Sequence, residues 1–383
     1  MNEINMQAIR GYIDEHRNEM IADLRAFVER ETPSEDKGLL DTFADYLAEY
    51  AEQRAGGYAT VLAHGVAGNQ VRVEWGEPEG KPPILLLGHY DTVWPAGALE
   101  TMPFAVQGGT ASGPGIFDMK CGLVQGFWGI KALREAAGVD RHVVLLCNSD
   151  EELGSPHSRP LIEESARDSR ATLVLEPSLG GALKTSRKGE SRFVVRVRGR
   201  AAHTGLDPEK GISAVDELAR LVLELHSYND SEAGTTVNVG VVRGGTRHNV
   251  VAAEAEAEVD VRFFVPEEER RMDALVRGLR PRNADASVEV EGGEVWPAMQ
   301  RNEKIARLFE TACRVGKELG IEVEEAAAGG SSDGCFCAAL GVPVLDGLGA
   351  VGAGAHAEDE HVVLSSMSER ASLISGMLAR LWR

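Results

Sequence analysis

The sequence predicts an α/β protein in which a mostly parallel sheet, covered by helices on both faces, is interrupted by a second unit with its own strand pattern. Continuous apolar runs, without the alternation of half-exposed strands, occur at 84–88, 143–147, 171–175 and 342–345. The helical patterns that separate them include 123–138 and 302–320. Strands that are apolar throughout are typical of a sheet buried on both faces. Their alternation with helices is typical of parallel pairing.

The segment before the first of these strands predicts a helix. Residues 1–34 combine a helical spacing of apolar residues with several acidic side chains. A signal peptide instead has a basic start, an apolar stretch and a cleavage site. We therefore expect one amphipathic helix here.

The middle of the chain predicts a separate unit. Alternating apolar and polar residues predict strands at 191–200, 235–242, 251–264 and 286–292. Helical patterns occur at 211–228 and 266–280. The resulting order β-α-β-β-α-β is that of a ferredoxin-like unit. We therefore expect an inserted domain at 185–293, with 1–184 and 294–383 forming one discontinuous domain.

Composition and charge limit the classes of partner. The 383 residues include 40 Lys and Arg against 60 Asp and Glu, which gives a formal net charge of −20. This charge disfavours nucleic acids and anionic membranes as partners, and no apolar run approaches the roughly 18 residues of a membrane span. The five cysteines include no CxxC pair. We therefore expect a reduced, cytoplasmic protein.

Side chains that can hold a metal follow the predicted strands where they end. They are His89 and Asp91 after 84–88, Asp150 to Glu152 after 143–147, Glu176 after 171–175 and His356 after 342–345. Asp118 lies in a Gly-rich turn before a helix. Each residue alone is more often a hydrogen-bonded loop residue, but ligands bind beyond the carboxyl ends of the strands in such sheets. The joint pattern therefore predicts one metal site.

The donor types predict a pair of divalent ions. Imidazole and carboxylate ligands without a thiolate suit zinc in a catalytic site, although cobalt or manganese can occupy such ligands. The candidates are too many for one tetrahedral ion. They suit two ions about 3.5–4 Å apart, which activate a water and polarise a carbonyl group.

Several motifs together give the sequence a resemblance to a known family. They are GHYDTVWPAG at 88–97, GPGIFDMK at 113–120, NSDEELGS at 148–155, LEPS at 175–178 and RAAHTG at 200–205. Over essentially its whole length the chain resembles the dinuclear-zinc metallopeptidases and aminoacylases, which are amidohydrolases. The similarity is closest to the glutamate carboxypeptidase branch.

The resemblance implies roles for the strand-end residues. One zinc would be held by His89 and Glu176, the other by Glu152 and His356, and both by Asp118. Asp91 would orient His89, and Glu151 would be the general base that moves a proton from water to the leaving amine. In an extended loop adjacent side chains point opposite ways, so Glu152 can face the metal while Glu151 faces the substrate. Asp150 is expected to be structural, and Cys121 a buried, inert thiol.

The resemblance also makes the inserted domain a dimerisation and lid domain. His203 would stabilise the oxyanion in the active site of the other subunit, which requires a homodimer. Asn249 and Arg262 match positions that bind the substrate's carboxylate, and Arg offers two parallel donors to a planar anion. Gly330 and Ser331 resemble a Gly-rich turn near the substrate.

These features predict a zinc-dependent carboxypeptidase that cleaves an amide or peptide bond of a small substrate and releases a glutamate-like amino acid. An N-acyl-amino-acid deacylase, of the acetylornithine deacetylase or desuccinylase type, remains open on the same site. A serine hydrolase is a third hypothesis, because residues 330–334 match G-x-S-x-G around Ser332, and Asp346 and His356 follow. That hypothesis leaves the other strand-end acids without a role.

Overall fold

The computed structural model describes residues 4–78 and 80–381, and they divide into two compact units. The first unit comprises the described residues up to Thr185, then Arg301–Ala328, and those from Ser332 onward. The second unit comprises Ser186–Gln300 and Gly329–Ser331. None of the helices in the described part of the chain combines the length and apolar character that a membrane span requires.

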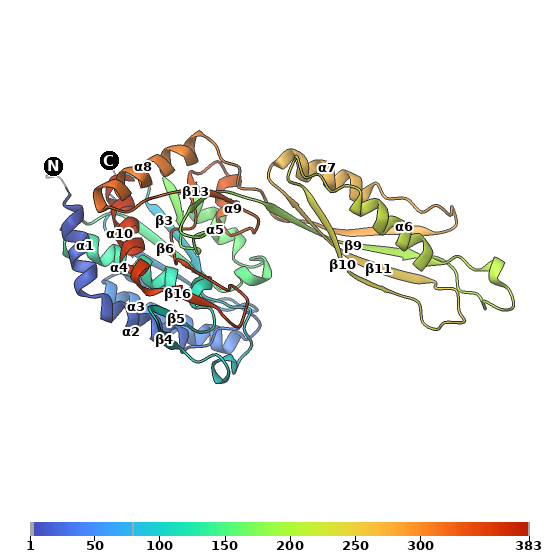
Figure 1. Cartoon of the computed structure of the whole chain (residues 1–383), viewed down its shortest axis with the longest axis horizontal. Coiled ribbons are helices and arrows are strands. Elements are labelled where there is room, and N and C mark those ends of the chain that lie inside the picture. The colour runs from blue at the N-terminus through green and yellow to red at the C-terminus, as the bar shows by residue number, and fades with distance from the viewer. Residues whose placement is uncertain (1–3, 79, 382–383) are drawn as a thin grey trace. The chain divides into compact units, whose positions relative to one another are not determined.

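The first unit is built on a six-stranded sheet in the order β1-β2-β6-β3-β7-β14 (Figure 1). The strands are β1 (Tyr58–Leu62), β2 (Gln70–Trp75), β3 (Ile84–His89), β6 (Val143–Asn148), β7 (Ala171–Val174) and β14 (Val344–Leu345). The four strands predicted from apolar runs pair in parallel, β6 with β3, β3 with β7 and β7 with β14. The two strands at the other edge pair antiparallel. The prediction of a mostly parallel sheet is therefore confirmed.

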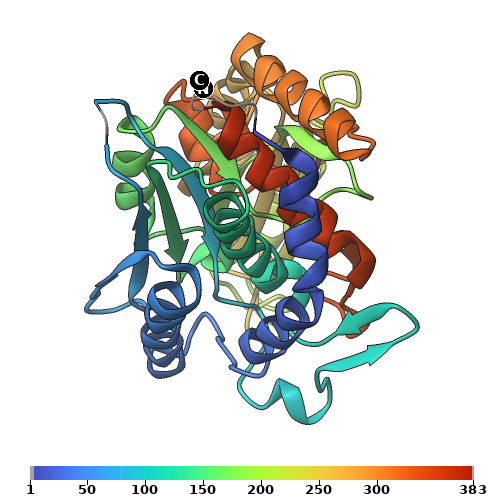
Figure 2. The same cartoon turned by 90° about the vertical axis from the view of Figure 1, so that its left-hand side faces the viewer.

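Helices cover both faces of this sheet. They are α1 (Met6–Glu15), α2 (Arg17–Val28), α3 (Lys37–Ala55), α4 (Cys121–Glu135), α5 (Arg159–Arg167), α8 (Glu303–Leu319), α9 (Gly334–Ala339) and α10 (Leu364–Leu381). Figure 2 shows α1, α4 and α10 side by side, with α4 against β3. On the other face α5 packs on α9, which contacts β7 and β14. The sheet is consequently buried on both sides, which explains its all-apolar strands.

The expected single N-terminal helix is wrong, because the described part of that segment forms two helices. The break is at His16, whose backbone (φ −99°, ψ 13°) leaves the helical region. The His16 N–H group still donates to the Tyr12 carbonyl, and the imidazole Nδ1 lies 2.7 Å from the same oxygen. These contacts satisfy the Tyr12 carbonyl locally and end α1. Helix α2 then starts in a new direction, and both helices bury apolar residues.

A small antiparallel sheet, in the order β15-β16-β5-β4, also belongs to the first unit. Its strands are β4 (Ala105–Gln107), β5 (Thr110–Ser112), β15 (Gly352–Ala353) and β16 (His361–Val363). A two-stranded sheet pairs β8 (Leu183–Arg187) with β13 (Glu325–Ala328). The small four-stranded sheet matters for function, because it places the loop at 354–360 beside the turn at 113–118.

The second unit has the predicted β-α-β-β-α-β order. Its elements are β9 (Gly189–Arg198), α6 (Ala214–His226), β10 (Thr236–Gly244), β11 (Glu254–Phe263), α7 (Pro266–Arg277) and β12 (Ser287–Trp296). The strands form an antiparallel sheet in the order β10-β11-β9-β12. Both helices pack on one face, over a core that includes Phe193 and Val261 (Figure 1). The opposite face carries ion pairs such as Arg196 with Glu256, whose Nε and Oε2 atoms are 2.6 Å apart.

Candidate active site

Three neighbouring parallel strands bring one histidine and two glutamates together. His89 is the last residue of β3, Glu151 begins a short 3₁₀ turn (Glu151–Leu153) after β6, and Glu176 follows β7. The Nε2 atom of His89 lies 3.4 Å from Oε1 of Glu176 and 4.0 Å from Oε2 of Glu151. We call His89, Glu151 and Glu176 the first donor set, since one atom of each lies within 4.8 Å of the others.

A second donor set consists of Asp118, Glu152 and His356, with the same mutual spacing. The Nε2 atom of His356 lies 3.4 Å from Oδ2 of Asp118 and 3.2 Å from Oε2 of Glu152. The other oxygen of Asp118, Oδ1, lies 3.2 Å from Nε2 of His89. One carboxylate therefore faces both histidines, and this is the arrangement that a bridging ligand requires.

The donor sets fit two divalent ions. Three of their polar atoms are buried without a hydrogen-bond partner in the described part of the chain: Nε2 of His89, Oδ1 of Asp118 and Oε1 of Glu152. Leaving a buried polar atom unsatisfied costs about 1–3 kcal/mol. One of these atoms belongs to the first donor set and two belong to the second. Nitrogen and oxygen donors in this number suit zinc, cobalt or manganese.

The raised pKa values of Glu151 and Glu152 indicate that burial destabilises their charged forms. Burial raises the pKa of Glu151 well above its usual range, and raises that of Glu152 to about 7. Burial opposes ionisation of Asp118 as well, but the neighbouring imidazoles of His356 and His89 outweigh it and hold the Asp118 pKa below its usual value. Asp118 and then Glu152 raise the pKa of His356 to about 10. Carboxylates this close need cations beside them, and bound divalent ions would meet that need.

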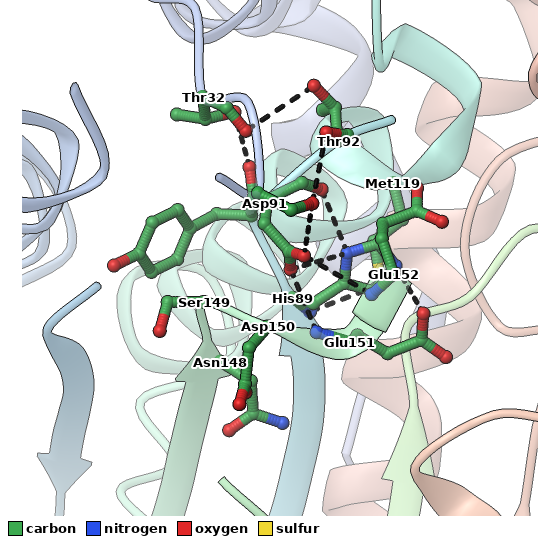
Figure 3. Close-up of polar contacts among 12 residues, drawn as sticks. Thr32, His89, Asp91, Thr92, Met119, Asn148, Ser149, Asp150, Glu151 and Glu152 are labelled. Atoms are coloured by element: carbon green, nitrogen blue, oxygen red, sulfur yellow. Dashed lines mark hydrogen bonds and ion pairs between the residues drawn. The ribbon is translucent and has the colours of Figure 1, made fainter. Parts of the chain in front are cut away.

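Asp91 connects His89 to the turn that carries the adjacent glutamates (Figure 3). Its Oδ1 atom lies 3.4 Å from Nδ1 of His89 and accepts the N–H group of Glu151 at 3.1 Å. Its Oδ2 atom accepts the N–H group of Glu152 at 3.2 Å and the Ser34 hydroxyl at 2.8 Å. Asp91 has no exposed surface. It therefore fixes the histidine and both glutamates to one point.

The loop that carries Glu151 and Glu152 is a 3₁₀ turn, so the expected extended loop is wrong. The two N–H groups share the Asp91 carboxylate, and this requires a tight turn rather than an extended strand. In a 3₁₀ turn successive side chains are about a third of a turn apart. Glu152 still reaches His356, while Glu151 lies on the side of His89.

Neighbouring residues complete the support of this turn. Asp150 accepts the N–H group of His157 at 2.8 Å and the hydroxyl of Ser158, both at the start of α5. Its role in the structure is thus to hold the chain that follows the turn.

Cys121 is fully buried at the start of α4, and burial raises the pKa of its thiol.

Three buried charged residues were missed by the sequence reasoning. Asp333 accepts Nδ2 of Asn148 at 2.6 Å and the hydroxyl of Ser155, and burial raises its pKa to about 7. Arg370 donates to the carbonyl groups of Gly347 and Gly349, at 2.7 and 3.0 Å, and so holds the loop whose Gly349 N–H group donates to the Glu176 carbonyl. Glu360 binds the turn that carries Asp118. In the sequence each looks like an ordinary loop or helix charge.

The other predicted residues lie in the second unit. His203 and Asn249 are close in space, since Thr204 N–H donates to the Asn249 carbonyl at 3.2 Å. Arg262 forms ion pairs with Glu190 at 2.8 Å and Asp260 at 2.9 Å.

The predicted Gly-rich turn is held within the second unit as well. The carbonyl groups of Gly330 and Ser331 accept Nη1 of Arg187 at 3.1 and 2.7 Å. The Ser331 hydroxyl donates to the Lys188 carbonyl at 2.8 Å.

The residues of the serine-hydrolase hypothesis do not form a triad. Ser332 is fully buried, and its hydroxyl donates to Oδ2 of Asp346 at 2.7 Å. His356, which would have to be the base, lies with Asp118 and Glu152 instead. A nucleophile needs a base within hydrogen-bond reach. The geometry therefore counts against this hypothesis.

Known proteins share this sequence pattern and fold. The family model "Peptidase family M20/M25/M40" matches residues 85–380. Carboxypeptidase G2 of Pseudomonas sp. is 33% identical, over 77% of this chain and 73% of its own length. Succinyl-diaminopimelate desuccinylase of Thioalkalivibrio sulfidiphilus is 26% identical, over 92% and 96%. The crystal structure of aminopeptidase PepT from Bacillus cereus has a TM-score of 0.76 at 18% identity, over 96% of this chain and 99% of that one.

The substitution Ser332→Ala separates the two chemistries. Because the Ser332 hydroxyl donates to the Asp346 carboxylate and has no base beside it, we expect the variant to keep its turnover and to lose about 1.5–3 kcal/mol of stability through the lost hydrogen bond to a charged group. Steady-state kinetics and thermal unfolding measure the two effects. A fall in kcat of about a thousandfold or more, in a folded variant, would instead identify Ser332 as the nucleophile.

Proposed function

Since this chain belongs to peptidase family M20/M25/M40, we propose that it is a metal-dependent hydrolase that cleaves an amide or peptide bond and releases a C-terminal, glutamate-like amino acid. The observation that carries the proposal is the pair of donor sets joined by Asp118, with Glu151 beside them. Family membership makes it a hydrolase. The bond and the released amino acid are the proposal.

Five residues are proposed to hold the ions. One ion would bind His89 and Glu176, the other Glu152 and His356, and both Asp118. Two divalent ions, for which zinc is the proposed species, would supply Lewis acidity that polarises the scissile carbonyl and lowers the pKa of a water. Asp91 keeps His89 turned so that its Nε2 atom faces the acids, because Nδ1 lies 3.1 Å from the Asp91 backbone carbonyl and 3.4 Å from the Asp91 carboxylate.

Glu151 is proposed as the general base. Its backbone is fixed by Asp91, and its Oε2 atom is 4.0 Å from Nε2 of His89, farther than Glu176. The carboxylate would take a proton from the attacking water and then deliver it to the leaving amine nitrogen, as the carbon–nitrogen bond breaks. Burial of Glu151 supports this role, since a carboxylate shielded from bulk water can keep the proton between the two steps.

The second unit is proposed to recognise the substrate. Arg262, with Asn249, would bind the α-carboxylate, and the planar guanidinium suits a planar anion. Gly330 and Ser331 would line the same region. His203 would stabilise the oxyanion in the site of a second copy of the chain, so the proposed active form is a homodimer. A basic side chain at the site also allows a chain of net charge −20 to bind an acidic substrate.

A deacylase of N-acyl amino acids is the alternative. The desuccinylase relative, which aligns with nearly all of this chain, supports it, and the same donor sets would serve. Carboxypeptidase G2, with higher identity, supports the carboxypeptidase. Both reactions hydrolyse an amide next to a carboxylate, and only the group on the other side of the bond differs. A cytoplasmic location is part of the proposal and rests on the free cysteines.

A substrate panel with and without chelator tests the reaction class. The panel contains peptides and folate-type amides ending in glutamate, and acetyl- and succinyl-amino acids. We expect release of the free amino acid, fastest for glutamate-terminated substrates, loss of activity in chelator and recovery with Zn²⁺, because the donor sets need cations. Activity that chelator does not change would contradict the proposal, and faster cleavage of succinyl or acetyl substrates would favour the deacylase.

The substitution Glu151→Gln tests the proposed base. It keeps the size of the side chain but cannot accept the proton, so we expect kcat to fall about 10²–10⁴-fold while two ions per chain remain bound. Metal content by elemental analysis is measured beside kcat. Because Glu151 also lies within the first donor set, loss of one ion in the variant would show that it is a ligand rather than the base.

Mixing two inactive variants tests the sharing of His203. Chains with Glu151→Gln and chains with His203→Ala are unfolded and refolded together. If each site takes its histidine from the other chain, a mixed dimer has one intact site, and random pairing restores roughly a quarter of wild-type activity. The separately refolded variants are the control. Activity no higher than theirs would argue against sharing.

A further inference from the structure

The small four-stranded sheet sets two loops side by side in the first unit. Strand β5 ends at Ser112 and leads into the Gly-rich turn that carries Asp118. Strand β16 pairs antiparallel with β5, with His361 opposite Ser112. The residue before β16, Glu360, is therefore directed to the start of that turn.

The Glu360 side chain makes four hydrogen bonds as an acceptor. Its Oε1 atom accepts the N–H groups of Phe117 at 2.8 Å and Asp118 at 3.1 Å. Its Oε2 atom accepts the Gly115 N–H group at 2.9 Å and Nε1 of Trp94 at 2.8 Å. Glu360 has no exposed surface. A buried carboxylate that accepts four donors holds the backbone around it in one conformation.

The same residue is tied to His356. Both lie in the loop between β15 and β16, and Glu360 N–H donates to the Ala357 carbonyl at 3.0 Å, while Ala357 N–H donates to the Gly354 carbonyl at 2.9 Å. His356 has a left-handed backbone, with φ of 63°, which few residues other than glycine adopt. This compact loop presents His356 at one end and the Glu360 carboxylate at the other.

We propose that Glu360 is a positioning residue that joins the His356 loop to the Asp118 turn and thereby assembles the second donor set. This rests on the proposed function, in which Asp118, Glu152 and His356 hold an ion. Glu360 belongs to neither donor set. It acts through the Asp118 N–H group, which it holds directly, and through the loop that it shares with His356.

The substitution Glu360→Gln tests the proposal, with Glu358→Gln as the matched control. Glutamine has the same shape, but its NH₂ group would face N–H donors, so at least two of the four hydrogen bonds are lost. Glu358 is an exposed acid in the same loop, so its replacement removes the same charge without these bonds. Equilibrium dialysis against buffered Zn²⁺ measures the affinity of each ion. Hydrogen exchange of the metal-free protein measures protection of the amides at 113–120.

The expected result is selective. In Glu360→Gln the ion proposed to bind Glu152, His356 and Asp118 is held about 10–100-fold more weakly, as is typical when a residue that supports metal ligands is lost. The other ion shares only Asp118 with that set, so its affinity falls less. The amides of Gly115, Phe117 and Asp118 exchange faster in the metal-free variant. Glu358→Gln matches the wild type in both measurements. Two ions bound with wild-type affinity, together with unchanged exchange, would overturn the proposal.

If Glu360→Gln does not fold, a second variant tests the proposal. Glu360→Asp keeps the charge but withdraws the carboxylate by one methylene group, so it should also weaken the second ion and expose the amides. Wild-type affinity and protection in this variant would overturn the proposal equally. A wild-type chain that bound no divalent ion would overturn the proposed function, and the role of Glu360 with it. If the wild-type chain binds two ions and the Glu360 variants bind them equally well, the role of Glu360 is wrong and the proposed function stands.

Discussion

The buried carboxylate of Asp91 accepts two successive backbone N–H groups, those of Glu151 and Glu152, while it lies against the imidazole of His89. A single anion thus fixes groups from the ends of two neighbouring strands, β3 and β6. The turn between Glu151 and Leu153 tightens to satisfy this anion, and its tightness separates the two glutamate side chains. Adjacent acids, which repel each other in sequence, come to serve different donor sets.

The remaining charges follow from this arrangement. The acids and histidines of the two donor sets include buried polar atoms that have no hydrogen-bond partner among the described residues. The carboxylates farther out are satisfied in full, Asp150 by the start of α5 and Glu360 by four N–H donors. Asp150 and Glu360 therefore use their hydrogen-bonding capacity to hold the backbone, whereas atoms of the donor sets keep theirs for a ligand. The proposed pair of divalent ions would satisfy these atoms without further protein donors.

Much of this arrangement could be predicted from the sequence, because it depends on patterns along the chain. Apolar runs such as 84–88 and 143–147 predicted the parallel strands. The residues after these runs, with Asp118 from the Gly-rich turn, are the members of the two donor sets, although Glu151 was predicted as the base rather than as a ligand. The break at His16 and the 3₁₀ turn could not be predicted, since single hydrogen bonds decide both. The roles of Glu360 and Asp333 could not be predicted from the sequence for another reason. Their side-chain partners lie more than about 170 residues away, and only the folded chain brings them together. The roles of His203, Asn249 and Arg262 stay predictions.

The second unit interrupts the first in the chain, and this has a consequence for synthesis on the ribosome. Every donor residue except His356 is made before Ser186, where the second unit begins. His356, the Glu360 loop and α10 follow only after that unit has been made. A nascent chain therefore carries an incomplete second donor set until its last segment emerges and packs on α4. The proposed metal site is therefore completed only after the second unit has been made.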